Sequence, residues 1–293
     1  MRLLVTGGSS FVGAHFCRLA ARQHEVFAVH YATPLSLPGI TCLRADLRRP
    51  RDVTRLRQVE ADAVVHIACK IQEPGGKGVD PAQAAVQTNR SMMDAVLELG
   101  RPTVYASSTV VHWSRSTPYA ESRREDEQRL ADSGLPWAVV RPSAPYGPRL
   151  ATHRPRHRES FHTLADLVRR SPVVPVIGDG RYRRQPLHVD DLSGAILALL
   201  DAGLPRRAFD AGGPQPLAFD EIVQTIARAA GTNPRLLHLP KALFVAAAKY
   251  HPDFDPNLIA AVDEDELADP GELIAATGRV PREFAAGARD LLR

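Results

Sequence analysis

The segment with the most specific chemistry is the octapeptide Thr6-Gly7-Gly8-Ser9-Ser10-Phe11-Val12-Gly13. It directly follows the apolar run 3–5 and opens a helical pattern. Glycine permits a tight turn and a close approach of backbone to a ligand, and the free N–H groups of a helix N-terminus attract anions. A glycine turn between a strand and a helix is the context of a dinucleotide-binding fingerprint. The segment therefore predicts a pyrophosphate-binding turn, with a plain structural turn as the alternative.

The second predicted strand ends in Val29-His30-Tyr31-Ala32, which contains no acidic residue. In dinucleotide-binding domains an acid at this place bonds the ribose 2′-hydroxyl of NAD, and its charge would repel a 2′-phosphate. Its absence favours NADP over NAD, with His30 as a candidate contact. The alternative interpretation of His30 is an exposed residue at the end of a strand.

Short apolar runs alternate with helical patterns over the first 140 residues. We expect strands at 3–5, 26–29, 40–43, 63–67, 103–106 and 137–140, and helices at 13–22, 53–58, 81–99 and 118–131. Asp80 and Thr117 precede prolines at first helical positions and are predicted N-caps. Runs that are apolar on both faces suit strands buried between helix layers. The alternation predicts an α/β fold with a doubly wound, Rossmann-type parallel sheet.

The pattern loosens after Pro148. Proline and arginine cluster up to about residue 186, a further helix is expected at 191–200, and residues 214–293 read as small helices. We expect a dinucleotide-binding domain over 1–150 and a smaller, mostly helical C-terminal substrate lobe over 151–293, with about 186–213 returning to the first domain. The basic stretch 149–158 and the acidic stretch 263–266 are interpreted as solvated loops. For the basic stretch, an anion or substrate contact is the alternative.

Composition narrows the class of protein. The 293 residues are 44% hydrophobic and 24% charged, as in ordinary globular proteins. No apolar run is long enough to span a membrane, no signal-peptide pattern is present, and no nucleic-acid motif accompanies the basic stretch. Cys17, Cys42 and Cys69 are far apart in apolar contexts, so we interpret them as reduced core residues of a cytoplasmic protein. No metal-ligand spacing is found, and a small-molecule substrate is the expected partner.

Ordered segments between residue 1 and about 213 resemble the extended short-chain dehydrogenase/reductases, the NAD-dependent epimerase/dehydratase group. Their order makes the resemblance more specific than any single motif. Besides the glycine turn, the matching segments are Ala45-Asp46-Leu47, His66-Ile67-Ala68-Cys69, Thr88-Asn89-Arg90-Ser91, Tyr105-Ala106-Ser107-Ser108, 118–123 for PYxxSK, 141–148 for RPxNxYGP, 178–191 for GDG…R…HVDD and 209–213 for NxGG.

The resemblance implies a catalytic group of Ser108, Tyr119 and Arg123. Ser108 would orient a carbonyl, Tyr119 would give a proton, and Arg123 would bond the nicotinamide ribose and lower the tyrosine pKa. Residues i and i+4 of a helix share a face, so Tyr119 and Arg123 can both meet a cofactor. The implied cofactor contacts are Gly7, Ser9, Ser10, Phe11, Val12, Gly13, His30, Asp46, Leu47, Ile67, Ala68, Cys69, Asn89, Arg123 and Pro142. The implied substrate contacts are Trp113, Tyr146 and Arg184.

Three residues depart from the family pattern. Ser10 replaces the middle glycine of the turn, Arg123 replaces the lysine of YxxxK, and Ala144 replaces the asparagine of RPxNxYGP. Arginine keeps the charge, but it is bulkier and planar, so the exchange is not conservative at a packed site. The asparagine contacts the diphosphate in members that bind nucleotide sugars, which alanine cannot do. Arg184 keeps the family's other phosphate-contacting position.

The sequence thus predicts an NAD(P)H-dependent ketoreductase that reduces a carbonyl by hydride transfer. The missing asparagine favours a substrate other than a nucleotide sugar. Our hypothesis is a bulky secondary-metabolite ketone, such as an aromatic polyketide of antibiotic biosynthesis. The first alternative is a nucleotide-sugar epimerase, dehydratase or 4-ketoreductase, although Thr109-Val110 after Ser108 supplies no acidic pair for a dehydratase. The second is a non-catalytic NAD(P)-binding sensor. The oligomeric state is left open.

Overall fold

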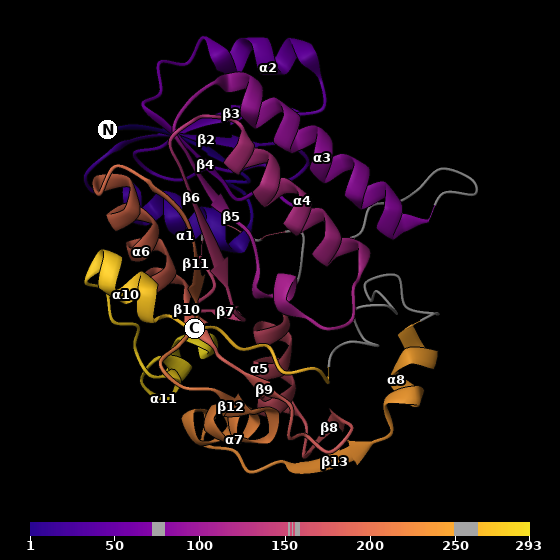
Figure 1. The fold of residues 1–293 in the computed structure, drawn as a ribbon. Coiled ribbons are helices and arrows are strands. Elements are labelled where there is room, and N and C mark those ends of the chain that lie inside the picture. Colours follow the sequence, from indigo (N-terminus) through magenta and orange to yellow (C-terminus); the bar gives the residue numbers. More distant parts are fainter. Residues whose placement is uncertain (72–79, 152, 154, 156–158, 249–262) are drawn as a thin grey trace.

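A seven-stranded parallel sheet forms the centre of the molecule (Figure 1). The computed structural model describes residues 1–71, 80–151, 153, 155, 159–248 and 263–293. In spatial order the strands are β11 (Pro205–Ala211), β6 (Trp137–Pro142), β5 (Thr103–Ala106), β4 (Ala63–His66), β1 (Arg2–Thr6), β2 (Glu25–His30) and β3 (Thr41–Arg44). The strand order reverses between β1 and β4, so the carboxyl ends of these two strands are the expected place for a bound ligand.

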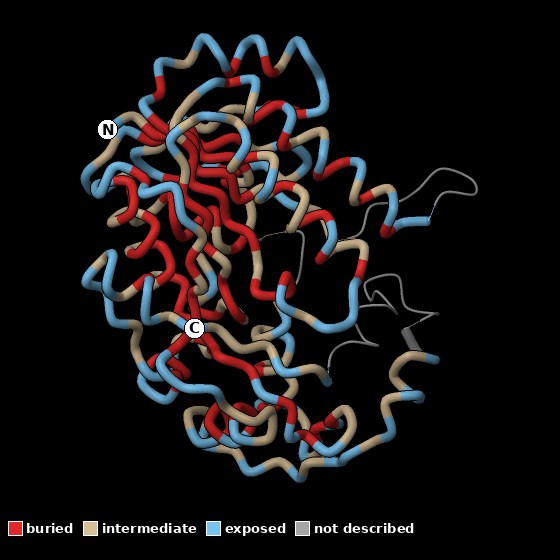
Figure 2. Tube along the Cα trace, in the orientation of Figure 1, coloured by how far each residue is buried: buried red, intermediate tan, exposed pale blue. Residues whose placement is uncertain are grey.

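Helices cover both faces of the sheet, which confirms the doubly wound α/β fold (Figure 1). On one face lie α1 (Phe11–Ala20) and α6 (Val189–Asp201), and on the other lie α2 (Pro50–Arg57), α3 (Pro81–Leu99) and α4 (Pro118–Asp132). Alternate strand residues supply the two cores. Leu3 and Val5 face α1 and α6, whereas Leu4 faces the other layer. In Figure 2, the buried parts of the chain, drawn in red, run along the strands of the central sheet.

The predicted element boundaries agree with the structure to within a few residues. Asp80 and Thr117 are N-caps, as predicted, because their side chains accept hydrogen bonds from the N–H groups of Ala82 and Ala120. The helix expected at 13–22 begins earlier, at Phe11, because Ser10 caps it. Helix α2 likewise begins at Pro50, which occupies a first-turn position.

A smaller lobe with its own core lies below the sheet in Figure 1. Its helical elements are α5 (Ser160–Arg170), α7 (Phe219–Ala230), α8 (Lys241–Ala248), α11 (Phe284–Gly287) and η2 (Ala288–Leu292), whereas α10 (Gly271–Thr277) packs against the main core through Leu273. Unlike the small helices predicted from the sequence, the lobe also holds paired strands. These pairs are β8 (Val173–Ile177) with β13 (Arg235–Leu239), β9 (Arg183–Arg184) with β12 (Leu217–Ala218), and β7 (Pro145–Tyr146) with β10 (Leu187–His188).

Residues 189–211 lie against the main sheet, since α6 packs on the α1 face and β11 pairs with β6. The domain limits at 150 and 186–213 remain a prediction. Among the described residues, no helix is long and apolar enough to cross a membrane. Within the same residues, no cluster of three histidine, cysteine or acidic side chains could hold a metal ion.

Candidate active site

The glycine turn between β1 and α1 has no room for side chains at two positions. Gly7 has a φ of 73°, and a Cβ there would lie 2.5 Å from the backbone nitrogen of Ala68. A Cβ on Gly13 would lie 2.1 Å from the Gly7 carbonyl oxygen. The departing residue, Ser10, uses its hydroxyl as the N-cap of α1 and accepts a 3.0 Å hydrogen bond from the Gly13 N–H. Packing within the protein therefore requires glycine at these two positions, and the pyrophosphate contact of the turn stays a prediction.

His30 lies at the end of β2, beside this turn. The backbone of Gly8 bonds the carbonyl of Val29, and His30 is in register with Arg44 on β3. Burial, followed by the charge of Arg44, lowers the pKa of His30. Its Nδ1 is buried without a hydrogen-bond partner among the described residues.

The basic stretch 149–158 reaches the same turn. The Nε2 of His153 donates a 2.8 Å hydrogen bond to the carbonyl of Ser9, and the His153 side chain is buried. For His153 the interpretation as part of a solvated loop is therefore wrong. No local sequence pattern indicates this contact, because the two residues are 144 positions apart. Residues 152, 154 and 156–158 lie outside the described residues.

Asp46, the predicted adenine contact, is engaged within the protein. Its carboxylate accepts hydrogen bonds from the backbone and the guanidinium of Arg48 at 2.9–3.1 Å. Burial raises the pKa of Asp46, but the bonds from Arg48 outweigh burial and hold it below its usual value. Leu47 is a core residue. The adenine contact of these two residues stays a prediction.

Asn89 on α3 positions the segment that follows β4. Its amide oxygen accepts from the Lys70 N–H and its amide nitrogen donates to the Lys70 carbonyl, both at 2.8 Å. The same nitrogen lies 3.3 Å from the Ser122 hydroxyl on α4. Asn89 thus links α3, α4 and the predicted cofactor segment 67–69. Within that segment Ile67 is buried, whereas Cys69 is exposed, so the prediction of a core position for Cys69 is wrong.

Ser108 follows β5 and caps the short helix η1 (Thr109–His112), its hydroxyl accepting from the Val110 N–H at 3.4 Å. Helix α4 is fastened to η1 because the guanidinium of Arg124 donates to the carbonyls of Val111 and Trp113. Tyr119 lies in the first turn of α4 and is partly buried. The end of β5 and the start of α4 therefore place Ser108 and Tyr119 at the same edge of the sheet.

Arg123 is turned into the protein, with only 1% of its surface exposed. Its guanidinium lies 5.3 Å from the ring centroids of both Tyr105 and Tyr119. The Nη2 atom is 3.4 Å from the Asp126 carboxylate, which also accepts a bond from the Tyr105 hydroxyl. The Nε and Nη1 atoms have no hydrogen-bond partner among the described residues. The structure thus couples Arg123 to Tyr119 through the ring face, and the ribose contact stays a prediction.

The pKa of Tyr119 is raised above its ordinary value. Burial is the main cause and the Cys69 thiol adds to it, while the Arg123 cation acts in the opposite direction. The Tyr119 hydroxyl is therefore protonated at neutral pH. A protonated hydroxyl can give a proton, whereas a base for alcohol oxidation must first lose one.

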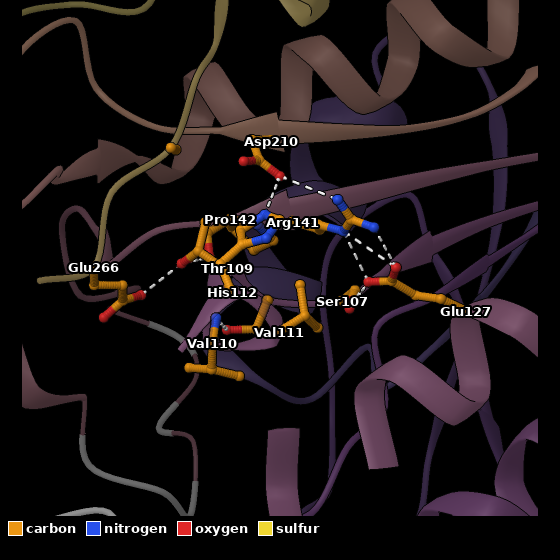
Figure 3. A network of polar contacts seen from close by, with 12 residues as sticks. Ser107, Thr109, Val110, Val111, His112, Glu127, Arg141, Pro142, Asp210 and Glu266 are labelled. Atoms are coloured by element: carbon orange, nitrogen blue, oxygen red, sulfur yellow. Dashed lines mark hydrogen bonds and ion pairs between the residues drawn. The ribbon is translucent and has the colours of Figure 1, made fainter. Parts of the chain in front are cut away.

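The adjacent residues Ser107 and Ser108 differ in their contacts, because Ser107 belongs to a network of charged side chains (Figure 3). The hydroxyl of Ser107 donates a 2.5 Å bond to Glu127, which is paired with Arg141. Arg141 also contacts Asp210, and Asp210 accepts from His112. Ser107 is bound within this network, and the catalytic role of the neighbouring Ser108 stays a prediction. No local sequence pattern indicates this network, because its members lie far apart in the chain.

The three predicted substrate contacts have different surroundings. Tyr146 is fully buried among Phe161, Phe284 and His188, and its substrate contact stays a prediction. Trp113 is partly buried, and its indole N–H has no partner among the described residues.

Arg184, the third predicted contact, pairs with Glu266 at 3.3 Å. Glu266 also accepts a 2.8 Å bond from the hydroxyl of Thr109, which in turn lies 3.4 Å from the Pro142 carbonyl (Figure 3). Pro142 itself is buried, and its predicted cofactor contact is not tested by these bonds. For Glu266 the interpretation as part of a solvated loop is therefore wrong, whereas Asp263 and Asp265 are exposed, as that interpretation predicted.

Ala144 lies in the left-handed region, with a φ of 44°. This conformation is unfavourable for alanine and better tolerated by asparagine, the residue of the family pattern. We expect Ala144→Asn to stabilise the fold by about 0.5–1 kcal/mol, which is a rise of about 1–3 °C in Tm by calorimetry. Ala144→Val is the opposing control and should lower Tm. A lower Tm for the asparagine variant would contradict the strain argument.

Comparison with known proteins agrees with the Rossmann-type fold and with the family that the motifs resemble. The family model described as NAD dependent epimerase/dehydratase family matches residues 3–212. A dTDP-4-dehydro-6-deoxy-D-allose reductase of a Streptomyces species is 30% identical over 246 residues, which cover 69% of this chain and 73% of the relative. The ceramide reductase of Caulobacter vibrioides is 28% identical over 259 residues, which cover 80% of this chain and 73% of the relative.

The fold is likewise shared with solved structures. The dTDP-glucose 4,6-dehydratase of Bacillus anthracis, solved in complex with NAD, has a TM-score of 0.79 at 17% identity, covering 100% of this chain and 96% of that chain. The family match spans nearly the whole region in which ordered motifs were found in the sequence, and so confirms the resemblance. The chain therefore belongs to the NAD-dependent epimerase/dehydratase family and is an NAD(P)-dependent enzyme.

Proposed function

We propose that this protein is an NAD(P)H-dependent ketoreductase. The observation that carries the proposal is the placement of two hydroxyl groups at one edge of the sheet, Ser108 directly after β5 and Tyr119 in the first turn of α4. Reduction of a carbonyl requires a proton donor at this place, whereas oxidation of an alcohol requires a base. Thr109 and Val110 offer no acidic pair beside Ser108 for the elimination of water.

The glycine turn fits a dinucleotide, because it leads directly into the N-terminus of α1, whose free N–H groups attract anions. Gly7 and Gly13 leave no space for a Cβ within this turn. When bound, the cofactor supplies the hydride that reduces the substrate carbon. The Ser108 hydroxyl donates a hydrogen bond to the carbonyl oxygen and orients it. Tyr119 gives its proton to that oxygen, which completes the alcohol. The Arg123 cation stabilises the resulting phenolate until solvent returns a proton.

The test is steady-state turnover of the purified protein with NADPH and with NADH, followed by nicotinamide absorbance. The substrate panel holds bulky aromatic and aliphatic ketones and a dTDP-4-keto sugar. We expect steady oxidation of the reduced cofactor with at least one ketone, and loss of that activity in Ser108→Ala. Cofactor binding without turnover across the panel would refute a reductase and favour a sensor.

We further propose that NADP is the preferred cofactor. His30 and Arg44 end neighbouring strands beside the glycine turn, where a 2′-phosphate would lie, and no acid ends β2. We expect Arg44→Ala to weaken NADPH binding about tenfold by removing one charged hydrogen bond, with little effect on NADH. Arg51→Ala, an exposed arginine on α2, is the matched control. An equal loss for both cofactors, or none, would overturn the assignment.

A bulky, uncharged secondary-metabolite ketone is the substrate class we propose. Two observations support it: Ala144 offers no amide to a diphosphate, and the Caulobacter relative is named for a lipid substrate. A nucleotide-sugar ketone reductase is the second candidate, which the Streptomyces relative favours. Turnover of the dTDP-4-keto sugar alone would select this second candidate.

A further inference from the structure

We propose that Glu266 makes the substrate pocket selective for uncharged ketones over ketones that carry a phosphate or carboxylate group. The inference rests on the proposed reductase function and names what that function selects. It adds a specificity-determining residue that comes from outside the segment matched by the family model, which ends at residue 212.

The carboxylate of Glu266 is bonded to the residue that directly follows the proposed catalytic serine. Its Oε1 accepts a 2.8 Å hydrogen bond from the hydroxyl of Thr109, the residue directly after Ser108 (Figure 3). The same negative charge contributes to raising the pKa of Tyr119, so it acts at the proton donor as well. A substrate whose carbonyl reaches Ser108 and Tyr119 therefore approaches a carboxylate that is already paired with Arg184.

The backbone around Glu266 is held in place on several sides. Its N–H donates to the carbonyl of Arg183 at 2.9 Å, and its carbonyl accepts from the Ser143 hydroxyl at 3.2 Å. Two residues later, the N–H of Ala268 donates to the side chain of Gln185 at 2.9 Å. These bonds fix the carboxylate before any substrate arrives, which is the condition for selectivity by electrostatics.

The acidic stretch also neutralises the cations that could attract an anionic substrate. Arg184 pairs with Glu266 at 3.3 Å and donates to the Glu264 carbonyl at 2.6 Å. Outside this pair, Arg183 is bound to Asp265 at 2.6 Å and Lys241 to Asp263 at 2.7 Å. A diphosphate could recruit Arg184 only by displacing Glu266, which would leave a carboxylate with 13% exposure without its partner.

An uncharged ketone meets none of these penalties. A hydroxyl or phenol near its carbonyl can donate a hydrogen bond to Glu266, so polar uncharged ketones should be favoured further. Ser143 bonds the Glu266 carbonyl, and the next residue, Ala144, supplies no polar side chain that could offset a negative charge on a substrate. The pocket therefore selects by repulsion of anions as well as by attraction of hydroxyl groups.

The experiment compares Glu266→Gln with Glu272→Gln, which removes an equal charge from an exposed ion pair between Glu272 on α10 and Arg207 on β11. The first readout is kcat/KM for an uncharged ketone and for the same ketone bearing a phosphate. We expect the wild-type protein to prefer the uncharged ketone. Glu266→Gln should improve the relative kcat/KM of the phosphorylated ketone by about tenfold, the scale of one nearby charge. Glu272→Gln should leave the ratio unchanged.

The second readout is calorimetric binding of UDP, which needs no turnover. We expect UDP to bind Glu266→Gln at least about tenfold more tightly than it binds the wild-type protein. An unchanged ketone ratio, or equal UDP affinity in the two proteins, would overturn the proposal. If no ketone is reduced at all, the reductase function fails, but the UDP comparison still decides the role of Glu266.

A measurement on the wild-type protein covers the case in which Glu266→Gln does not fold. Salt screens charge–charge repulsion, so kcat/KM for the phosphorylated ketone should rise with ionic strength while that for the uncharged ketone stays constant. A fall for the phosphorylated ketone would mean net attraction and would contradict the proposal.

Discussion

Replacing Tyr119 with phenylalanine should lower kcat for ketone reduction by about 10²–10⁴-fold, the usual contribution of a positioned acid. The cofactor dissociation constant should not change, because the ring that stacks on Arg123 is retained. Single-turnover kinetics with saturating NADPH separates the chemical step from binding. Tyr146→Phe is the matched control, since the Tyr146 hydroxyl is buried without a partner among the described residues. Equal rates for wild type and Tyr119→Phe would show that the proton comes from another group.

The pH dependence of the same reaction gives an independent check of Tyr119. Its raised pKa means that the hydroxyl stays protonated through neutral pH. Reduction should therefore be independent of pH across this range and should fall only above the ordinary tyrosine pKa of about 10. The reverse reaction, oxidation of the product alcohol, needs the phenolate and should rise with pH over the same range. A fall in the reduction rate between pH 7 and 8 would contradict the assignment.

Replacing Arg123 with methionine should lower the free energy of unfolding by about 3–5 kcal/mol, because the buried Asp126 carboxylate then loses its closer cation and keeps Arg129 at 3.8 Å. The loss should appear in urea unfolding of the protein without cofactor. Burial already raises the pKa of Asp126, and Arg123 is the main group that opposes this rise. In the single variant the carboxyl should therefore take up a proton.

A double variant and a surface control distinguish the ion pair from the loss of packing. Arg123→Met with Asp126→Asn should recover more than half of the lost stability, since no buried charge remains. Arg90→Met removes an arginine whose side chain is 63% exposed and pairs with Glu125, and should cost less than about 1 kcal/mol. If Arg123→Met cost no more than Arg90→Met, the buried pair would not contribute to stability.

The sequence by itself determined the sheet, the glycine turn and the two helix caps at Asp80 and Thr117. Each depends on residues close together in the chain: the period of apolar residues, the glycines of the turn, and a cap followed by proline. The order of the motifs also identified the family and placed Ser108 and Tyr119 at the ends of a predicted strand and helix. Local patterns were sufficient because these features form within a few residues.

Only the tertiary structure decided what surrounds those residues. The carboxylate of Glu266 accepts a hydrogen bond from Thr109, which lies 157 positions earlier in the chain. No local pattern distinguishes an acid that is bonded within the protein from one that faces solvent. The burial of Tyr146 depends on Phe284, which comes from another part of the lobe. The inward direction of Arg123 depends on Tyr105 and on Asp126, one turn further along α4. Selectivity and charge in this site therefore come from the packing of distant segments, and a linear sequence does not display that packing.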